Sequence, residues 1–307
     1  MQKKEIRLEV HKRKLGLRAR IYYLIIGCIL GFAVIVTLYP ILNTIAISFN
    51  EAYDTIRGGV HLLPRKFTLV NYRTVLQKDS MGTGLVVSVL RTGIGIVTHL
   101  FCTALLAFVL SRKEFIFRKQ ATFYYVLTMY VSGGMVPTFL LFRNLGFINS
   151  FWVYIIPGLV SAYDMIVIRT YISALPDSLQ ESAMMDGAGY FTIFVSVIAP
   201  LSKPVFATIA LFIGVGQWNS WFDTMLYNRM NPKLTTLQYE LMKLLSTVST
   251  MSGSSANVYG NTQTKTMLTT TSVQAAATVL TCLPIVVLYP FLQRYFVAGL
   301  TIGGVKE

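Results

Sequence analysis

Charged side chains are scarce in this sequence of 307 residues, at 13%, whereas a soluble domain usually carries about 25%. Hydrophobic residues make up 54%, and the mean hydropathy is +0.57. Such a chain has too little polar side-chain surface to cover an ordinary globular core. Its apolar residues also fall in blocks of roughly 20, the length that crosses the hydrocarbon of a bilayer. The scarcity of charge therefore argues against a soluble domain and predicts an integral membrane protein.

Cysteine and histidine are rare too, with three of each. Cys28, Cys102 and Cys282 each lie in an apolar run and show neither paired nor metal-ligand spacing, which predicts small packing residues. The histidines are scattered over the basic tail, a loop and a span. We therefore expect no metal site and no cofactor on this chain.

The sequence also lacks the Gly-x4-Gly-Lys-Ser/Thr loop that cradles nucleotide phosphates. Its acidic residues are dispersed over both predicted faces, which weighs against a membrane enzyme such as a lipid-linked glycosyltransferase. There is no convincing internal repeat, whereas secondary transporters commonly carry repeated halves. A secondary sugar transporter and, less favourably, a glycosyltransferase stay open as alternatives on these grounds alone.

Basic residues are present in excess, with a net charge of +14, and their positions are informative. Eight of the 27 Lys and Arg residues lie in residues 1–20, directly before the first apolar run. Arg112, Lys113, Arg118 and Lys119 lie between the second and third runs. Basic residues that flank spans on one side mark the cytoplasmic face. This distribution predicts a cytoplasmic basic tail and contacts with lipid headgroups, and no nucleic acid.

The apolar runs predict an all-α polytopic fold with six transmembrane helices. The first run is longer than the 7 to 15 residues of a cleaved signal, so we expect it to be retained. The expected spans are Tyr22–Leu42, Gly84–Leu110, Thr122–Leu141, Phe151–Ala174, Val205–Trp221 and Val273–Leu292. Residues 21–83 would then hold the first span and an extracytoplasmic segment, 84–292 the main transmembrane domain, and 293–307 a second cytoplasmic tail.

The loop 175–204, between the fourth and fifth spans, falls on the inner face of this topology. Pro176 and Asp177 predict a helix start, which Asp177 or Ser178 could cap. One apolar face of about three turns follows, and Gly187 and Gly189 can end that helix in a sharp turn. Two helices too short to span would form a cytoplasmic elbow. The elbow would either meet another protein or rest on the membrane surface as an amphipathic hairpin.

The same loop resembles the coupling loop of bacterial ABC importer permeases, whose pattern is Glu-Ala-Ala, three residues, Gly, nine residues, Ile-x-Leu-Pro. Glu181, Ala183, Gly187 and Pro200 match in register, and Ser182 replaces the first Ala. The resemblance extends from about Thr68 to the end of the chain. Its further matches are Asn71-Tyr72, Ser111-Arg112-Lys113, Gly133-Gly134, Pro137-Thr138, Asp186-Gly187-Ala188 and Trp218-Asn219-Ser220-Trp221. These residues are similar to the subfamily that imports complex oligosaccharides.

The resemblance implies a type I importer permease fold and a machine of several proteins in the bacterial cell membrane. This chain would be one of two channel subunits, beside two cytoplasmic ATPases that bind ATP and Mg, and an extracytoplasmic binding protein that delivers sugar. The chain itself would not be an enzyme. Glu181 would form an ionic contact with the ATPase. Ser182, Ala183 and Gly187 would pack closely against it. Asp186 would position the loop, and Pro200 would close the motif. Gly303, Gly304 and Lys306, in a tail similar to that of the smaller maltose-importer channel subunit, would reach between the ATPases.

The substrate path is predicted from residue chemistry, because sugars stack on aromatic rings while polar side chains take their hydroxyls. The candidates are Tyr130, Tyr163, Asp164, Trp218, Asn219, Trp221 and Asp223. Trp and Tyr also anchor spans at membrane interfaces, so both roles stay open for them. Asp164 is expected to face a wet path or a partner such as Arg169, because a carboxylate inside a span is costly. Arg91 is expected to snorkel to the interface.

Overall fold

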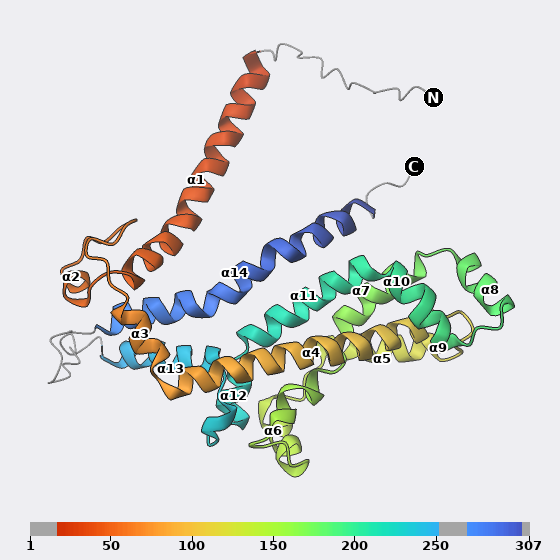
Figure 1. Cartoon of the computed structure of the whole chain (residues 1–307). Helices are drawn as coiled ribbons and strands as arrows, with labels where there is room; N and C mark the ends of the chain where they lie inside the picture. Colours follow the sequence, from red (N-terminus) through yellow and green to blue (C-terminus); the bar gives the residue numbers. More distant parts are fainter. Residues whose placement is uncertain (1–16, 252–268, 303–307) are drawn as a thin grey trace.

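The computed structural model describes residues 17–251 and 269–302, and within them the chain is almost entirely helical (Figure 1). The longest helices are α1 (Leu17–Ser48), α4 (Asp79–Ser111), α11 (Lys203–Asn219), α13 (Leu237–Met251) and α14 (Thr270–Ile302). The intermediate ones are α5 (Arg118–Tyr130), α6 (Met135–Asn144) and α7 (Ala162–Ser173). Short elements connect them: α2 (Ala52–Ile56), α3 (Val70–Leu76), η1 (Phe151–Tyr154), η2 (Ile156–Gly158), α12 (Phe222–Tyr227) and η4 (Pro232–Leu234). An all-α fold is therefore confirmed.

Two stretches of the described chain are each long and apolar enough to cross a membrane as one helix, namely Ile21–Ser48 and α4. Three further pairs of helices pass the same test but are bent, and a shorter apolar helix covers Thr271–Val287. Helix is present at all six predicted spans, although several are broken. The number of spans stays a prediction, because length and composition alone do not place a membrane.

The third predicted span, Thr122–Leu141, is not one continuous helix. Its two halves, α5 and α6, meet at an angle of 116°. The break lies at Gly133 and Gly134, and Gly134 has φ +85°, a conformation that glycine adopts without a steric penalty. Pro137, in the first turn of α6, has no backbone N–H to continue the preceding helix. The predicted span Thr122–Leu141 is therefore a bent pair of helices, because the glycine pair interrupts an otherwise apolar stretch.

Besides a small apolar cluster around Val153 and Tyr154, two larger ones hold the helices together. One joins α4, α7 and α11 with the helix at Tyr190–Leu201, and its most buried members include Ala107, Ile168 and Ile209. The other lies around Trp218 and Leu237, between α11, α13 and α14. Two glycines let α4 and α11 approach closely. A Cβ on Gly95 would lie 3.1 Å from the Gln217 side chain, and one on Gly214 would lie 3.0 Å from Ile96. Gly93 and Gly216 face open space.

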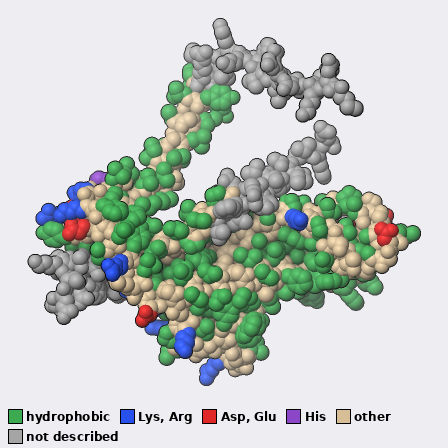
Figure 2. All heavy atoms as spheres, in the orientation of Figure 1, with side chains coloured by type: hydrophobic (Ala, Val, Ile, Leu, Met, Phe, Trp, Pro, Cys, Tyr) green, Lys and Arg blue, Asp and Glu red, His purple; other side chains and the backbone are tan. Residues whose placement is uncertain are grey.

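Different short helices lie at the two ends of the molecule (Figure 1), and much of the face shown between them is apolar (Figure 2). One end carries α2, α3 and α12, and the opposite tip carries α8 (Asp177–Met185) and α9 (Tyr190–Ile193). Helix α1 leans away from the other helices for much of its length, and in its apolar window no residue is buried. Such a surface needs lipid or another protein to cover it.

Candidate functional site

The elbow begins with α8, and its first residues attach it to the end of α4. Neither Asp177 nor Ser178 caps this helix, contrary to expectation, since Pro176 is the N-cap residue and no side-chain cap bond forms. The Asp177 carboxylate instead accepts a bond from Lys113 Nζ at 2.6 Å. This hydrogen bond lowers the pKa of Asp177 and raises the pKa of Lys113. The basic pair after the second span and the elbow therefore lie at the same end of the molecule.

Gly187 makes the turn of the elbow. Its φ is +80°, and two backbone bonds close the end of α8, from Gly187 N to Met184 O at 2.9 Å and from Ala188 N to Ala183 O at 3.0 Å. This pair of bonds is a Schellman motif, in which the left-handed residue is usually glycine. Gly189 has φ −72°, an extended conformation that any residue can adopt. The predicted glycine turn is present, and it depends on Gly187 alone.

The elbow presents one face to the protein and leaves the other free. Ala183 and Met184 pack on the apolar cluster beneath α8, as does Ala188. Glu181, Ser182, Asp186 and Met185 are exposed on the other side, Met185 by 89%. Sequence reasoning did not select Met185, although a long apolar side chain at the tip of a polar turn is a signal of a contact surface.

The second limb of the elbow is a helix over Tyr190–Leu201 that meets α11 at 84°. It begins as α9, contains a π-helical turn at Phe194–Ile198, and ends as α10 (Ala199–Leu201) with Pro200 in its first turn. Ile193 and Ile198 are buried in the apolar cluster. Packed side chains therefore connect this limb of the elbow to α4, α7 and α11.

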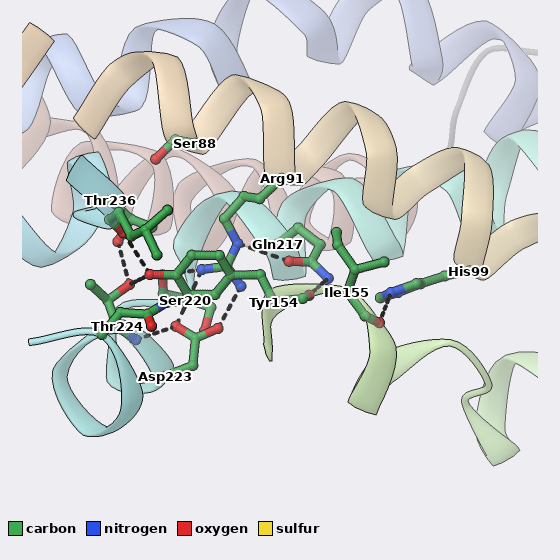
Figure 3. Close-up of polar contacts among 12 residues, drawn as sticks. Ser88, Arg91, His99, Tyr154, Ile155, Gln217, Ser220, Asp223, Thr224 and Thr236 are labelled. Carbon is green, nitrogen blue, oxygen red and sulfur yellow. Dashed lines mark hydrogen bonds and ion pairs between the residues drawn. The ribbon is translucent and has the colours of Figure 1, made fainter. Parts of the chain in front are cut away.

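A buried polar cluster lies at the other end of α4 (Figure 3). Arg91 is 2% exposed, so the expectation that it snorkels to the interface was wrong. Its guanidinium donates to both carboxylate oxygens of Asp223, at 2.5 and 3.2 Å, to Gln217 Oε1 at 2.9 Å and to Ser220 O at 3.3 Å. Its centre lies 4.3 Å from the centroid of the Tyr154 ring. We call these five residues the Arg91 cluster.

Polar side chains also support the break in the fourth predicted span, where carbonyls at η1 and η2 accept bonds from side chains of α4 and α11. His99 Nε2 donates to Ile155 O at 2.8 Å, and Gln217 Nε2 donates to Tyr154 O at 3.1 Å (Figure 3). Thr103 Oγ1 donates to Leu159 O at 3.3 Å. Irregular backbone at membrane depth needs such partners. The polar residues of α4 and α11 therefore make this break possible.

A cavity of about 420 Å³ lies beside the Arg91 cluster. Asp164 and Ser161 line it together with His99, Thr103 and Tyr227. Asp164 is 8% exposed. It forms no ion pair with Arg169, which donates instead to Thr122 Oγ1 at 2.9 Å. Asp164 thus faces a polar cavity between the helices, as its cost inside a span predicts.

Of the other predicted path residues, Asp223 lines the same cavity as Asp164, and the remaining five do not. Trp218 is 7% exposed, and its Nε1 donates to Thr281 O on α14 at 3.0 Å, so it anchors two helices. Tyr130 and Tyr163 are 81% and 54% exposed, and neither lines the cavity. Asn219 is exposed, and Trp221 lines a different groove. The tail residues Gly303, Gly304 and Lys306 lie outside the described residues.

Three relatives match almost the whole chain, although no family model does. The polygalacturonan/rhamnogalacturonan transport system permease protein YtcP of Bacillus subtilis is 34% identical over 283 residues, covering 92% of this chain and 97% of the relative. Protein LplC of the same organism is 33% identical and covers 90% and 92%. The arabinooligosaccharides transport system permease protein AraQ of Halalkalibacterium halodurans is 28% identical and covers 90% and 95%.

Two solved structures have the same fold. A chain of a bacterial ABC transporter involved in the import of the acidic polysaccharide alginate matches with a TM-score of 0.82 and 27% identity, covering 92% of this chain and 99% of that one. A chain of a bacterial alginate ABC transporter in complex with a pentasaccharide-bound periplasmic protein matches with a TM-score of 0.57 at 13% identity, which is a likeness of fold alone.

Proposed function

Because the chain belongs to the permease family of oligosaccharide ABC importers, we propose that it is one of two channel-forming subunits and that its elbow couples the channel to a separate ATPase. Relatives that are permeases of ABC importers do not favour the alternatives of a secondary transporter or a glycosyltransferase. The N- and C-terminal tails and the elbow would lie in the cytoplasm, and α2, α3 and α12 outside.

The free face of the elbow supports the coupling role. Glu181 and Asp186 are exposed and make no ion pair among the residues that the structure describes, so both charges are available to a partner. The opposite face packs on α4, α7 and α11. Closure of two ATPases on ATP would move the elbows, and the packed spans would follow as rigid bodies. The exposed length of α1 would lie against the second permease subunit or lipid.

Gly187→Asp tests the coupling role. The new side chain would strain the left-handed turn and place a second negative charge beside Asp186, so we expect sugar uptake to be lost while the complex still assembles and hydrolyses ATP. Gly189→Asp adds the same charge at an ordinary backbone conformation and is the matched control. Normal uptake by Gly187→Asp, with unchanged protein levels in the membrane, would contradict the proposal.

The cavity beside the Arg91 cluster is proposed as this chain's part of the sugar path, with Asp164 as a hydroxyl acceptor. We expect Asp164→Asn to reduce uptake and Asp164→Cys to react with a water-soluble thiol reagent. The free cysteines Cys28, Cys102 and Cys282 would be replaced first. Unchanged transport by Asp164→Asn, together with a Cys that resists labelling, would remove Asp164 from the path.

A further inference from the structure

The end of the molecule that carries α2, α3 and α12 holds more positive charge than its own acidic residues neutralise. Four acidic residues there, Glu51, Asp54, Asp223 and Glu240, are already paired with Lys or Arg. Among the described residues, the basic side chains of this end without an ion pair are Arg57, Arg73, Lys78, Arg229 and Lys233, against Asp79 alone for the acidic ones. Basic residues beside spans are disfavoured on an outer face, so this excess calls for an anionic partner.

A groove of about 860 Å³ opens within this basic end, in the size range of small-ligand sites. Its first wall is the segment from Trp221 through α12 to η4, with Arg229, Asn231 and Lys233. The start of α4, with Ser80 and Thr83, and one side of α13 form the facing wall. Trp221 is partly exposed in the groove, whereas Trp218 is buried in the protein.

Of the two acidic groups of the groove, Glu240 is already paired, whereas Asp79 is exposed and forms no ion pair in the described chain. Glu240 accepts bonds from Thr235 Oγ1 at 2.6 Å and from Lys243 Nζ at 2.5 Å. Asp79 lies in the first turn of α4, where the helix dipole favours a negative charge. Arg229 and Lys233 are exposed and unpaired within the described chain. By contrast, the guanidinium of Arg91 in the intramembrane cavity is already occupied by Asp223.

We propose that this groove is a subsite for an acidic oligosaccharide, one whose sugars carry carboxylates, at the entrance to the importer. Arg229 and Lys233 pair with a uronate carboxylate, since guanidinium and ammonium groups form charge-assisted bonds to it. The ring of Trp221 takes the apolar face of a sugar, and the hydroxyls of Ser80 and Thr83 meet its hydroxyl groups. The subsite rests on the proposed import function and names the class of glycan that it serves.

The test is a binding titration on the assembled importer in nanodiscs of zwitterionic lipid, without the binding protein. The probes are trigalacturonate and a neutral galactotriose. We expect trigalacturonate to bind at least about tenfold more tightly, because charge-assisted bonds are lost with the neutral probe. We expect the Arg229→Gln/Lys233→Gln variant to remove that preference and high salt to weaken it. The matched control is Arg73→Gln/Lys78→Gln, which removes two basic residues of the same end that do not line the groove.

Equal affinity for the two probes, or a preference that survives in Arg229→Gln/Lys233→Gln, would overturn the subsite. So would loss of trigalacturonate binding when anionic lipid is added to the nanodisc, because the groove would then hold a lipid headgroup. The import function is tested separately, by measuring ATP-dependent uptake of glycans into vesicles that contain the importer. That function fails if no glycan is taken up. Gly187→Asp separates the two, since it is expected to abolish uptake and leave trigalacturonate binding unchanged.

Discussion

The Arg91 cluster and the elbow lie at opposite ends of the same bundle and use polar residues in opposite ways. Arg91 is 2% exposed and its guanidinium is bonded to groups from α11, α12 and the link between them. Glu181 and Asp186 on the elbow are exposed, and no ion pair to either occurs in the described chain. Polar groups with internal partners hold the spans together, whereas those left free are available to another protein.

This contrast gives different expectations for the two ends. Substitutions in the Arg91 cluster should lower stability first and transport as a consequence. Substitutions on the free face of the elbow should leave stability nearly unchanged and remove transport directly.

The largest loss of stability is expected for Arg91→Met. It leaves the Asp223 carboxylate without its cation, and breaking a buried pair in this way costs about 3–5 kcal/mol. Thermal unfolding of the purified complex measures the effect. In Arg91→Met/Asp223→Asn no unpaired charge is left, so we expect part of the stability to return. A single variant as stable as the wild type would show that the pair is not structural.

A smaller loss is expected for Gly158→Ala. A Cβ at this position would lie 2.8 Å from Cε1 of His99 and would push the ring away from Ile155 O. Overpacking together with a lost buried hydrogen bond costs about 1–3 kcal/mol. Gly93→Ala is the control, because no atom lies within 4 Å of its added Cβ. Equal unfolding temperatures for the two variants would refute the close contact.

At the elbow, Gly187→Ala is expected to strain the turn by about 1–2 kcal/mol, because a side chain disfavours the left-handed conformation. The effect stays local, so we expect faster hydrogen exchange at Gly187 N–H and Ala188 N–H and reduced uptake, with little change in the unfolding temperature. Gly189→Ala should change neither. A large drop in unfolding temperature for Gly187→Ala would mean that the elbow is part of the structural core.

The smallest effect is expected for the exposed pair between Lys113 and Asp177. The lowered pKa of Asp177 means that its contribution is present above the ordinary value of 3.8 and is lost as pH falls through the lowered folded value. The raised pKa of Lys113 means that its contribution is present below 10.5 and is lost as pH rises further. Between these limits we expect the attachment of α8 to α4 to be independent of pH, as measured by hydrogen exchange in α8. A change near pH 6 or 7 would contradict this assignment.

Features set by neighbouring residues could be predicted from the sequence. The helix at each apolar run, the elbow and the turn at Gly187 all follow from hydrophobic periodicity and glycine chemistry. The cost of a carboxylate in a span also predicted that Asp164 would face a wet path or a partner, and Asp164 lines the cavity beside the Arg91 cluster. The bend in the third predicted span was not predicted, although the Gly133-Gly134 pair lies within that span.

Features that depend on distant parts of the chain could not be predicted. Arg91 and Asp223 are 132 residues apart, and their pairing needs α4 and α11 to cross closely at Gly95 and Gly214. When that crossing is not known, an arginine near a span end is expected to snorkel, because its charge then stays in water. Trp218 and Trp221 have the same local chemistry, and only the position of α14 decides that Trp218 is buried.

The most direct test of the coupling claim is photocrosslinking of the assembled importer with a reactive amino acid at the position of Glu181 and, as a control, at that of Arg73. A crosslink to an ATP-hydrolysing subunit from Glu181 alone, stronger when ATP is bound, is the predicted result. No crosslink from Glu181, or an ATPase crosslinked from Arg73 at the other end, would contradict the account.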